Sequence, residues 1–152
     1  MKRTLLLTGL LLGLVGWGRG QHTRDLPGVQ MALSTFFEAL NQGTPDQMAP
    51  ILSDSLELIS IMDRRGRPSM RTVPVADFLE AVGRPREQEW LEITRNVRVH
   101  LDGFLAQAWM DYQFFLGDNL HHCGVNNITL FHNGEKWIII HLVDTQHKLN
   151  CE

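Results

Sequence analysis

The sequence has little of what several large classes of protein require. Its 14 lysine and arginine residues are scattered along the chain and its formal net charge is -3, so it offers no basic patch to nucleic acid or to an anionic membrane. Neither partner is expected. No CxxC pair and no spacing typical of metal ligands occurs, and the sequence therefore predicts no metal site and no cofactor. Internal repeats and low-complexity segments are also absent.

The first residues have the pattern of a secretory signal peptide. Met1–Arg3 is basic, Leu5–Trp17 is apolar, and small glycines follow up to Gly20. The apolar run is about a dozen residues long, whereas a helix that spans a membrane needs about 20. We therefore expect a signal peptide over 1–20, a flexible lead-in over 21–27 and a secreted or periplasmic protein. An uncleaved membrane anchor is the alternative.

Cysteine is scarce, with only Cys123 and Cys151 present. An even number of cysteines in an exported chain favours a disulfide, since exported proteins mature in an oxidising compartment. Closing a loop of this length would stabilise the fold by roughly 3–4 kcal/mol in the chain-entropy description. Two free thiols are the alternative.

Residues 28–152 are enough for one hydrophobic core and too few for two, so they are expected to form one domain. Apolar residues recur at helical spacing over 29–40, and a threonine, proline and glutamine at 44–47 are typical of the start of a short second helix. A first strand is predicted near 56–61 and a third helix over 75–82. The later strands are predicted over 91–101, 104–116, 120–132 and 135–146.

Short turns between these four later strands predict their pairing. Asp-Gly at 102–103 and Asn-Gly at 133–134 suit two-residue hairpin loops, and residues 117–119 suit a three-residue loop. A hairpin loop of known length determines which residues lie opposite one another, and therefore which side chains share a face of the sheet.

This register makes one face of the sheet strongly apolar, with four polar interruptions. Those four residues are Arg95, Tyr112, Asn126 and His141. Arg95 is predicted beside Met110, Met110 beside Asn126, and Asn126 beside His141, with Tyr112 on the adjacent row. Since a buried polar group without a partner costs about 1–3 kcal/mol, the row should be hydrogen-bonded internally or directed at a ligand.

The opposite face is predicted to be partly wet and to become apolar toward the last strand, through Ile138, Ile140 and Leu142. The tail or another subunit would have to cover that surface, so a homodimer through the outer face is one expectation. His121 and His122 are predicted on opposite faces, as neighbours on a strand are, and so are not expected to share a metal ion.

Element order and four local segments carry a resemblance to a known family. The order is helix, helix, strand, helix and a four-strand meander. The segments are Phe37-x-Ala39-Leu40-Asn41-x-Gly43, His122-Cys123-Gly124-Val125-Asn126, Gly134-x-Lys136-Trp137-x-Ile139 and Val143-Asp144-Thr145 with Asn150-Cys151. Together they resemble the nuclear transport factor 2-like superfamily. The last three segments are similar to the small, exported, lumazine-binding-like branch. The resemblance covers most of 28–152 and implies an α+β, cystatin-like cone, in which three helices pack on a curved antiparallel sheet and leave a pocket open at one end.

Within that cone, the candidate ligand-binding residues are the inward row and its aromatic neighbours. They are Arg95, Met110, Tyr112, Asn126, Trp137 and His141. Four of them have an alternative role: His141 could be a core histidine bonded to Asn126, Arg95 could reach solvent, and the aromatic rings of Tyr112 and Trp137 could fill the core.

The predicted inner face decides between two classes of function. Enzymatic members of the superfamily place an acidic base or a His/Asp pair in the pocket, whereas the derived inner face has no carboxylate on the four later strands. That absence favours a non-enzymatic module that binds a small, mostly apolar molecule. The alternative is a cofactor-free lyase or isomerase, of the dehydratase, isomerase or cyclase type, that uses His141 with Tyr112 or Asp54.

Overall fold

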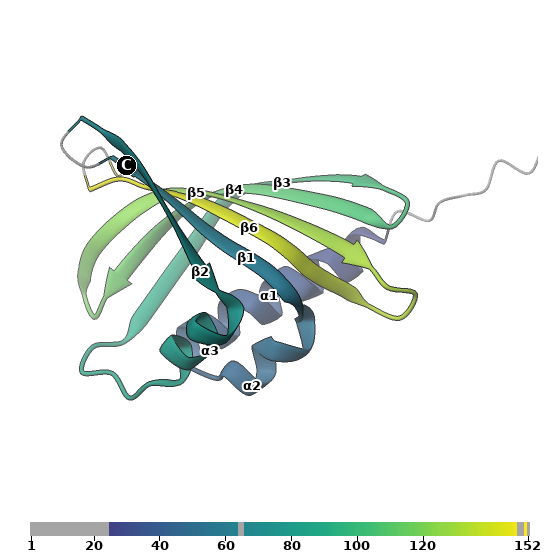
Figure 1. The fold of residues 1–152 in the computed structure, drawn as a ribbon, viewed down its shortest axis with the longest axis horizontal. Helices are drawn as coiled ribbons and strands as arrows, with labels where there is room; N and C mark the ends of the chain where they lie inside the picture. Colours follow the sequence, from purple (N-terminus) through teal and green to yellow (C-terminus); the bar gives the residue numbers. More distant parts are fainter. Residues whose placement is uncertain (1–24, 64–65, 149–150, 152) are drawn as a thin grey trace, which may run out of the picture.

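A computed structural model describes residues 25–63, 66–148 and 151; the predicted signal peptide lies outside them. The helices cover one face of a single curved sheet (Figure 1). In chain order the elements are α1 (Leu26–Gln42), α2 (Pro45–Met48), the short 3-10 helix η1 (Ala49–Ile51), β1 (Leu52–Asp63), β2 (Pro68–Pro74), α3 (Val75–Gly83), β3 (Trp90–Asp102), β4 (Leu105–Leu116), β5 (Asn119–His132) and β6 (Trp137–Gln146). The predicted α+β cone is confirmed.

The sheet has six strands in the order β2-β1-β6-β5-β4-β3. All neighbours are antiparallel except β1 and β6, which run parallel. Strand β2 was not predicted. It pairs with β1 from Asp63 opposite Pro68 to Glu57 opposite Pro74. Its prolines at both ends and its mostly exposed residues give no pattern typical of a buried strand. Both features are compatible with an edge strand.

Helix α1 begins earlier than its apolar spacing predicts. The Asp25 side chain accepts a hydrogen bond from the Gly28 N–H at 3.0 Å, and Pro27 lies in the first turn. Residues 26 and 27, predicted in the flexible lead-in, are therefore helical. The helix ends at Gly43, whose φ of 70° suits glycine and whose N–H donates to the Ala39 carbonyl.

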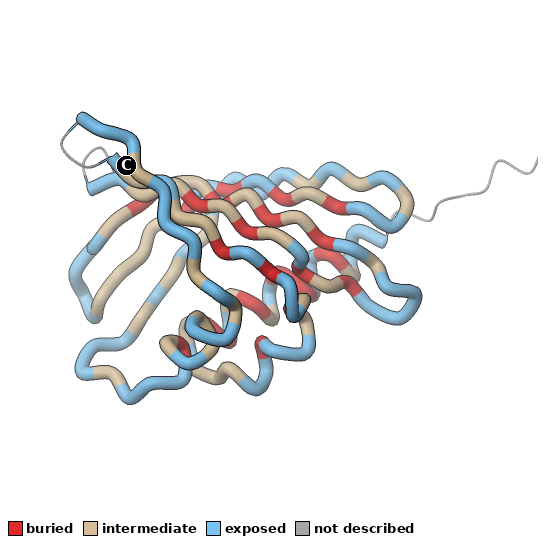
Figure 2. Tube along the Cα trace, in the orientation of Figure 1, coloured by how far each residue is buried: buried red, intermediate tan, exposed pale blue. Residues whose placement is uncertain are grey.

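The core lies between α1 and the inner face of the sheet, where Figure 2 shows a band of buried positions. Seven of the apolar residues predicted on the inner face of β4, β5 and β6 are buried there. They are Ala106, Ala108, Met110, Ile128, Leu130, Trp137 and Ile139. At this end of the sheet the predicted alternation of faces is confirmed.

Strands β4 and β5 pair as predicted from Leu105 opposite Phe131 to Phe114 opposite His122, but the predicted three-residue loop is wrong, since Leu116 pairs with Asn119. Within the predicted stretch, Met110 lies opposite Asn126. The next pairing differs: Asn126 lies opposite Asp144, and the predicted pairing with His141 is wrong. The loop before β6 is longer than two residues, since His132 pairs with Trp137, and Ile140 is unpaired between Ile139 and His141. This bulge reverses the faces of β6 beyond it.

A second bulge interrupts β3 at Asn96 and Val97. Asn96 has a φ of 53°, a conformation that asparagine tolerates better than most residues, and its Nδ2 donates to Asp111 Oδ2 at 2.7 Å. The loop before β4 is also displaced, with Asp102 opposite Leu105. Arg95 consequently lies opposite Asp111 rather than Met110.

A disulfide joins Cys123 on β5 to Cys151, which confirms the predicted pairing. Backbone hydrogen bonds between Cys123 and His147 reinforce the attachment of the tail. Such a bond fits an oxidising compartment. Within the described residues, no helix combines the length and the hydrophobicity needed to cross a membrane.

The outer face of the sheet near β6 is made of other residues than predicted. Leu142 is buried on the inner face, since it follows the β6 bulge, whereas Ile140 is 36% exposed. The homodimer through this face stays a prediction.

Candidate functional site

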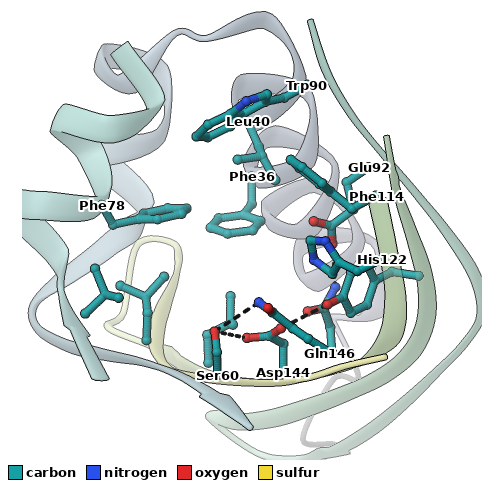
Figure 3. A pocket seen from close by; sticks show the side chains of 15 residues that line it. Phe36, Leu40, Ser60, Phe78, Trp90, Glu92, Phe114, His122, Asp144 and Gln146 are labelled. Carbon is teal, nitrogen blue, oxygen red and sulfur yellow. Dashed lines mark hydrogen bonds between the residues drawn. The ribbon is translucent and has the colours of Figure 1, made fainter. Parts of the chain in front are cut away.

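A cavity of roughly 200 Å³ lies between the helices and the open end of the sheet (Figure 3). Most of its wall is apolar, and its polar groups gather on the sheet side. The lining residues are Phe36, Leu40, Leu58, Ser60, Val73, Phe78, Trp90, Glu92, Tyr112, Phe114, His122, Asn126, Leu142, Asp144 and Gln146. The volume is below the roughly 300–1,000 Å³ usual for drug-sized ligands, so the cavity suits a smaller molecule.

Aromatic rings form much of the apolar wall. Phe36 of α1 and Phe78 of α3 stack with their centroids 6.1 Å apart. Across the pocket, Trp90 and Phe114 meet edge to face at 5.8 Å, and Phe114 lies 4.9 Å from the His122 ring. Figure 3 shows these rings facing the cavity from both the helices and the sheet.

Glu92 comes from the segment of β3 that precedes the bulge. Its backbone is anchored to α1, since its N–H donates to Asn41 Oδ1 at 2.7 Å and its carbonyl accepts from Asn41 Nδ2 at 3.2 Å. Its Oε1 accepts a hydrogen bond from Asn126 Nδ2 at 2.6 Å. The side chain is half-buried, and protein atoms replace most of the water around the carboxyl group.

This burial raises the pKa of Glu92 to about 7. The hydrogen bond from Asn126 acts in the opposite direction and lowers the pKa, while the negative charge of Asp144 raises it further. At neutral pH both the protonated and the charged forms of Glu92 are therefore populated.

Asp144 is the second acid of the pocket, and the protein already satisfies both of its oxygens. Ser60 Oγ donates to Oδ1 at 2.6 Å, and the Tyr112 hydroxyl approaches Oδ2 at 2.9 Å and the Thr145 carbonyl at 3.0 Å. Gln146 Nε2 donates to Ser60 Oγ at 3.3 Å. Burial and then the charge of Asp144 raise the pKa of Tyr112, so its hydroxyl stays protonated.

His122 completes the polar wall. Burial, and then the charge of His121, lowers the pKa of His122 to about 4, so its ring is neutral at neutral pH. The Nδ1 atoms of the two histidines are 2.8 Å apart, and the prediction that the rings point to opposite faces is wrong. A register shift at this point of β5 explains the difference, since Phe114 pairs with His122 but Phe115 pairs with Leu120. Among the described residues, no group of three or more His, Cys, Asp or Glu side chains could hold a metal ion.

The structure brings two of the six predicted ligand-binding residues into the pocket, Tyr112 and Asn126. Met110 and Trp137 are buried elsewhere in the core, and Trp137 Nε1 donates to Asp25 Oδ2 at 3.1 Å. Both residues fill space in the core, which for Trp137 was the predicted alternative.

Arg95 and His141 do not reach the pocket. Arg95 is exposed, opposite Asp111 on the outer face, and His141 lies on the outer face between Thr129 and Glu57. The predicted catalytic use of His141 with Tyr112 or Asp54 is also wrong. His141 lies outside the cavity, and Asp54 is exposed and does not line it.

The predicted absence of inward carboxylates is wrong as well, because Glu92 and Asp144 both line the pocket. The faces were predicted by counting from the hairpin turns. A bulge lies between the turn and each acid, so both side chains point to the face opposite to the predicted one. Two sequence signals accompany the bulges: adjacent polar residues at Arg95 and Asn96, and three consecutive isoleucines at 138–140.

No protein-family model matches the chain, and no curated protein matches it at a significant level. Solved structures do match it. A nuclear transport factor 2-like protein of unknown function from Shewanella baltica OS155 is 15% identical, with a TM-score of 0.62 over 80% of this chain and 92% of that chain. A nuclear transport factor 2-like protein with a cystatin-like fold from Novosphingobium aromaticivorans is 10% identical, with a TM-score of 0.66 over 84% of each chain.

A third match is the "putative dehydratase from the NTF2-like family" of Streptomyces avermitilis, which is 13% identical with a TM-score of 0.60 over 81% of this chain and 96% of that chain. Identities this low show a shared fold and do not identify a function. They do not confirm the likeness to the lumazine-binding-like branch. The chain has the nuclear transport factor 2-like, or cystatin-like, fold.

Proposed function

We propose that the pocket binds a small, mostly apolar molecule and that Glu92 transfers a proton on it, in a reaction of the lyase or isomerase type. One observation carries this proposal: Glu92 is a buried carboxyl group at the wall of an apolar cavity, with a pKa raised to about 7. A group with that pKa can accept and return a proton at neutral pH, which is what a general base requires.

The hydrogen bonds around Glu92 leave it free to act on a ligand. Asn126 holds Oε1, and no described side chain bonds Oε2. In the charged form, Oε2 would take a proton from an acidic C–H of the ligand, while the electron pair of that bond moves into the adjoining unsaturated or leaving group. The acid formed would return the proton to a second atom in an isomerisation, or to the leaving group in an elimination.

The other polar groups have supporting roles in this proposal. Tyr112 and Ser60 already donate to Asp144, so these three residues keep the sheet side of the pocket in position. Neutral His122 can donate one hydrogen bond to the ligand or accept one from it. The dehydratase description of the Streptomyces avermitilis protein belongs to that protein, and it supports this proposal only through the shared fold.

Binding without chemistry is the second candidate function. It is favoured by the network around Asp144, which satisfies Asp144 and Tyr112 inside the protein and leaves them no unpaired group to offer to a substrate. Native mass spectrometry of the purified protein, compared with an Asn126→Ala variant, would detect a molecule that co-purifies and show whether it occupies this cavity.

A nitrobenzisoxazole tests the proposed base directly, since its ring opens when a correctly placed base removes one proton. We expect the rate to rise with pH through about 7. The Glu92→Gln variant should lower the rate by roughly a hundredfold or more, the contribution typical of a general base. Glu57→Gln is the matched control, because Glu57 is an exposed acid on the outer face. Equal rates in Glu92→Gln and wild type would reject Glu92 as the base.

We also propose that the protein is exported. The disulfide between Cys123 and Cys151 supports an oxidising compartment, and the basic and apolar pattern of the first residues supports a signal peptide. Export predicts a mature mass that lacks residues 1–20, and recovery of the full-length chain from the cytoplasm alone would contradict it.

A further inference from the structure

We propose that the ligand of this pocket carries a positive charge, as a small organic ammonium ion with apolar substituents. This inference rests on the proposed binding role of the pocket and specifies the chemical class of what it binds. Two features of the wall support it independently: the balance of charged side chains and the arrangement of aromatic rings.

The charge balance of the pocket is one-sided. Glu92 and Asp144 both line it, and none of the lining residues is lysine or arginine. The one ion pair found within residues 25–63, 66–148 and 151 joins Arg84 to Glu80 on the surface and involves neither acid. Ser60 and Tyr112 satisfy the oxygens of Asp144, but no described side chain bonds Glu92 Oε2. Because buried charges in proteins are normally paired, the charged form of Glu92 lacks a counter-ion that a cationic ligand would supply.

Arg86, His122 and Lys148 do not supply that cation. Arg86 lies 4.4 Å from the centre of the Trp90 ring but donates to the Val82 carbonyl at 3.1 Å and does not line the cavity. His122 is neutral, because its pKa is lowered to about 4. Lys148 is exposed, and its charge lowers the pKa of His122 rather than neutralising either acid.

The aromatic wall suits the same kind of ligand. Phe36 and Phe78 present rings from the helices, and Phe114 lies beside Glu92 (Figure 3). Trp90 also lines the cavity, with Arg86 over its ring. Ring faces attract cations, and the attraction is strongest where water is excluded. Aromatic cages with a nearby acid are the usual way in which proteins recognise methylated ammonium groups, whose charge is spread over apolar surface.

Ligands of other charge fit less well. An anion would meet two carboxylates in a cavity lined by no lysine or arginine, and like charges at short range repel strongly where little water screens them. A neutral hydrocarbon would contact the apolar wall but leave the charged form of Glu92 without a counter-ion. A cation binds the rings and the acids together.

Phenyltrimethylammonium and tert-butylbenzene provide the test, because they have the same shape and differ in charge. In calorimetric titrations of the mature protein above the pKa of Glu92, we expect the cation to bind about ten- to thirtyfold more tightly. Benzenesulfonate, an anion of similar size, should not bind measurably. Equal or tighter binding of tert-butylbenzene, or no binding of the cation at millimolar concentration, would overturn the proposal.

Variants of the acids locate the effect. Glu92→Gln and Asp144→Asn should each weaken binding of the cation several-fold and leave the affinity for tert-butylbenzene unchanged. Glu57→Gln should change neither affinity. Asp144 is buried and its variant could unfold, so the Glu92→Gln result and the pH dependence decide the matter. An unaltered cation affinity in Glu92→Gln would reject the role of that acid.

The pH dependence follows from ionisation of Glu92. Affinity for the cation should rise as the pH passes through about 7, and protons should be released on binding because the cation favours charged Glu92. Asp144, Tyr112 and His122 are the other titratable groups of the pocket; Tyr112 and His122 stay neutral over this range, and Glu92→Gln should remove the dependence.

The titrations also separate this inference from the proposed chemistry. Glu92-dependent opening of the nitrobenzisoxazole without any preference for the cation would retain the general base and overturn the cationic ligand. A clear preference for phenyltrimethylammonium without that activity would retain the cationic ligand and reject the general base.

Discussion

The two ends of the curved sheet differ in both chemistry and predictability. At the end that holds Ile139 and Leu130, both side chains are fully buried and the sequence pattern alternates regularly. At the other end the strands carry Glu92, Tyr112 and Asp144 into a cavity. Bulges in β3 and β6 separate the two ends. The comparison shows that one fold can keep a dry core and an acidic pocket on the same face by reversing side-chain direction part-way along a strand.

The largest effect is expected from removing a core side chain at the closed end of the sheet, the end that holds Ile139 and Leu130. Ile139→Ala removes a fully buried side chain and should lower the free energy of unfolding by roughly 3–5 kcal/mol. Leu142→Ala, on the same strand but beyond the bulge, should cost only about 2 kcal/mol, because Leu142 already borders empty space. Urea unfolding of both variants measures the difference. Similar losses would mean that the pocket end is packed as tightly as the closed end.

A smaller effect is expected from the buried acid at the open end. Glu92 has a folded-state pKa of about 7 against an unfolded value of 4.5, so the folded protein retains a proton that the unfolded chain releases. Its contribution to stability is present below the lower value and lost as the pH rises through the higher one. Glu92→Gln, which cannot ionise, should avoid this loss of at most about 3 kcal/mol.

Comparing wild type with Glu92→Gln separates the contribution of Glu92 from that of His122. The pKa of His122 is lowered from 6.5 to about 4, so its contribution to stability is present above the higher value and lost as the pH falls through the lower one. It therefore opposes Glu92 over much of the same range. The measurement is the difference between the wild-type and Glu92→Gln stability curves, and a constant difference between pH values of about 4.5 and 7 would contradict the prediction.

The smallest effect is expected at the β3 bulge. Asn96 has a φ of 53°, in the left-handed region that alanine adopts unfavourably. If the bulge persists, Asn96→Ala should lower the free energy of unfolding by about 1–2 kcal/mol. Asn96→Gly keeps the conformation accessible and tests the loss of the hydrogen bond to Asp111 alone. Unfolding midpoints give both values, and equal losses would show that backbone conformation is not what asparagine contributes.

Asn96→Ala can also relax by removing the bulge. In that case Glu92 would turn to the outer face and the stability difference linked to its pKa would disappear, because an exposed carboxyl group ionises normally. Measuring the pH dependence of this variant therefore shows whether the bulge is what directs Glu92 into the pocket.

Much of the fold could be predicted from local sequence. Helical spacing identified α1, and turn residues identified the hairpins around β4 and β5, where the pairing of Met110 with Asn126 is correct. Strand β2 was missed because an exposed edge strand needs no regular apolar alternation. The start of α1 was missed because Asp25 and Pro27 act by capping and not by burial.

The site was less predictable than the fold. Tyr112 and Asn126 lie on β4 and β5, at positions where the predicted register holds. Glu92 and Asp144 lie on the flanking strands beyond bulges, and each such interruption exchanges the two faces of the strand that follows. An error of one residue in register therefore moved Arg95 and His141 into the predicted pocket and both acids out of it.

The sequence by itself determined the class of fold, the disulfide partners and the dry half of the core, because helical spacing, the cysteine count and regular alternation are all local patterns. Only the tertiary structure decided which acids enter the cavity and what raises the pKa of Glu92. The physical reason is that side-chain direction in a sheet depends on bulges and loop lengths, and that burial and the charge of Asp144 act across strands distant in the chain.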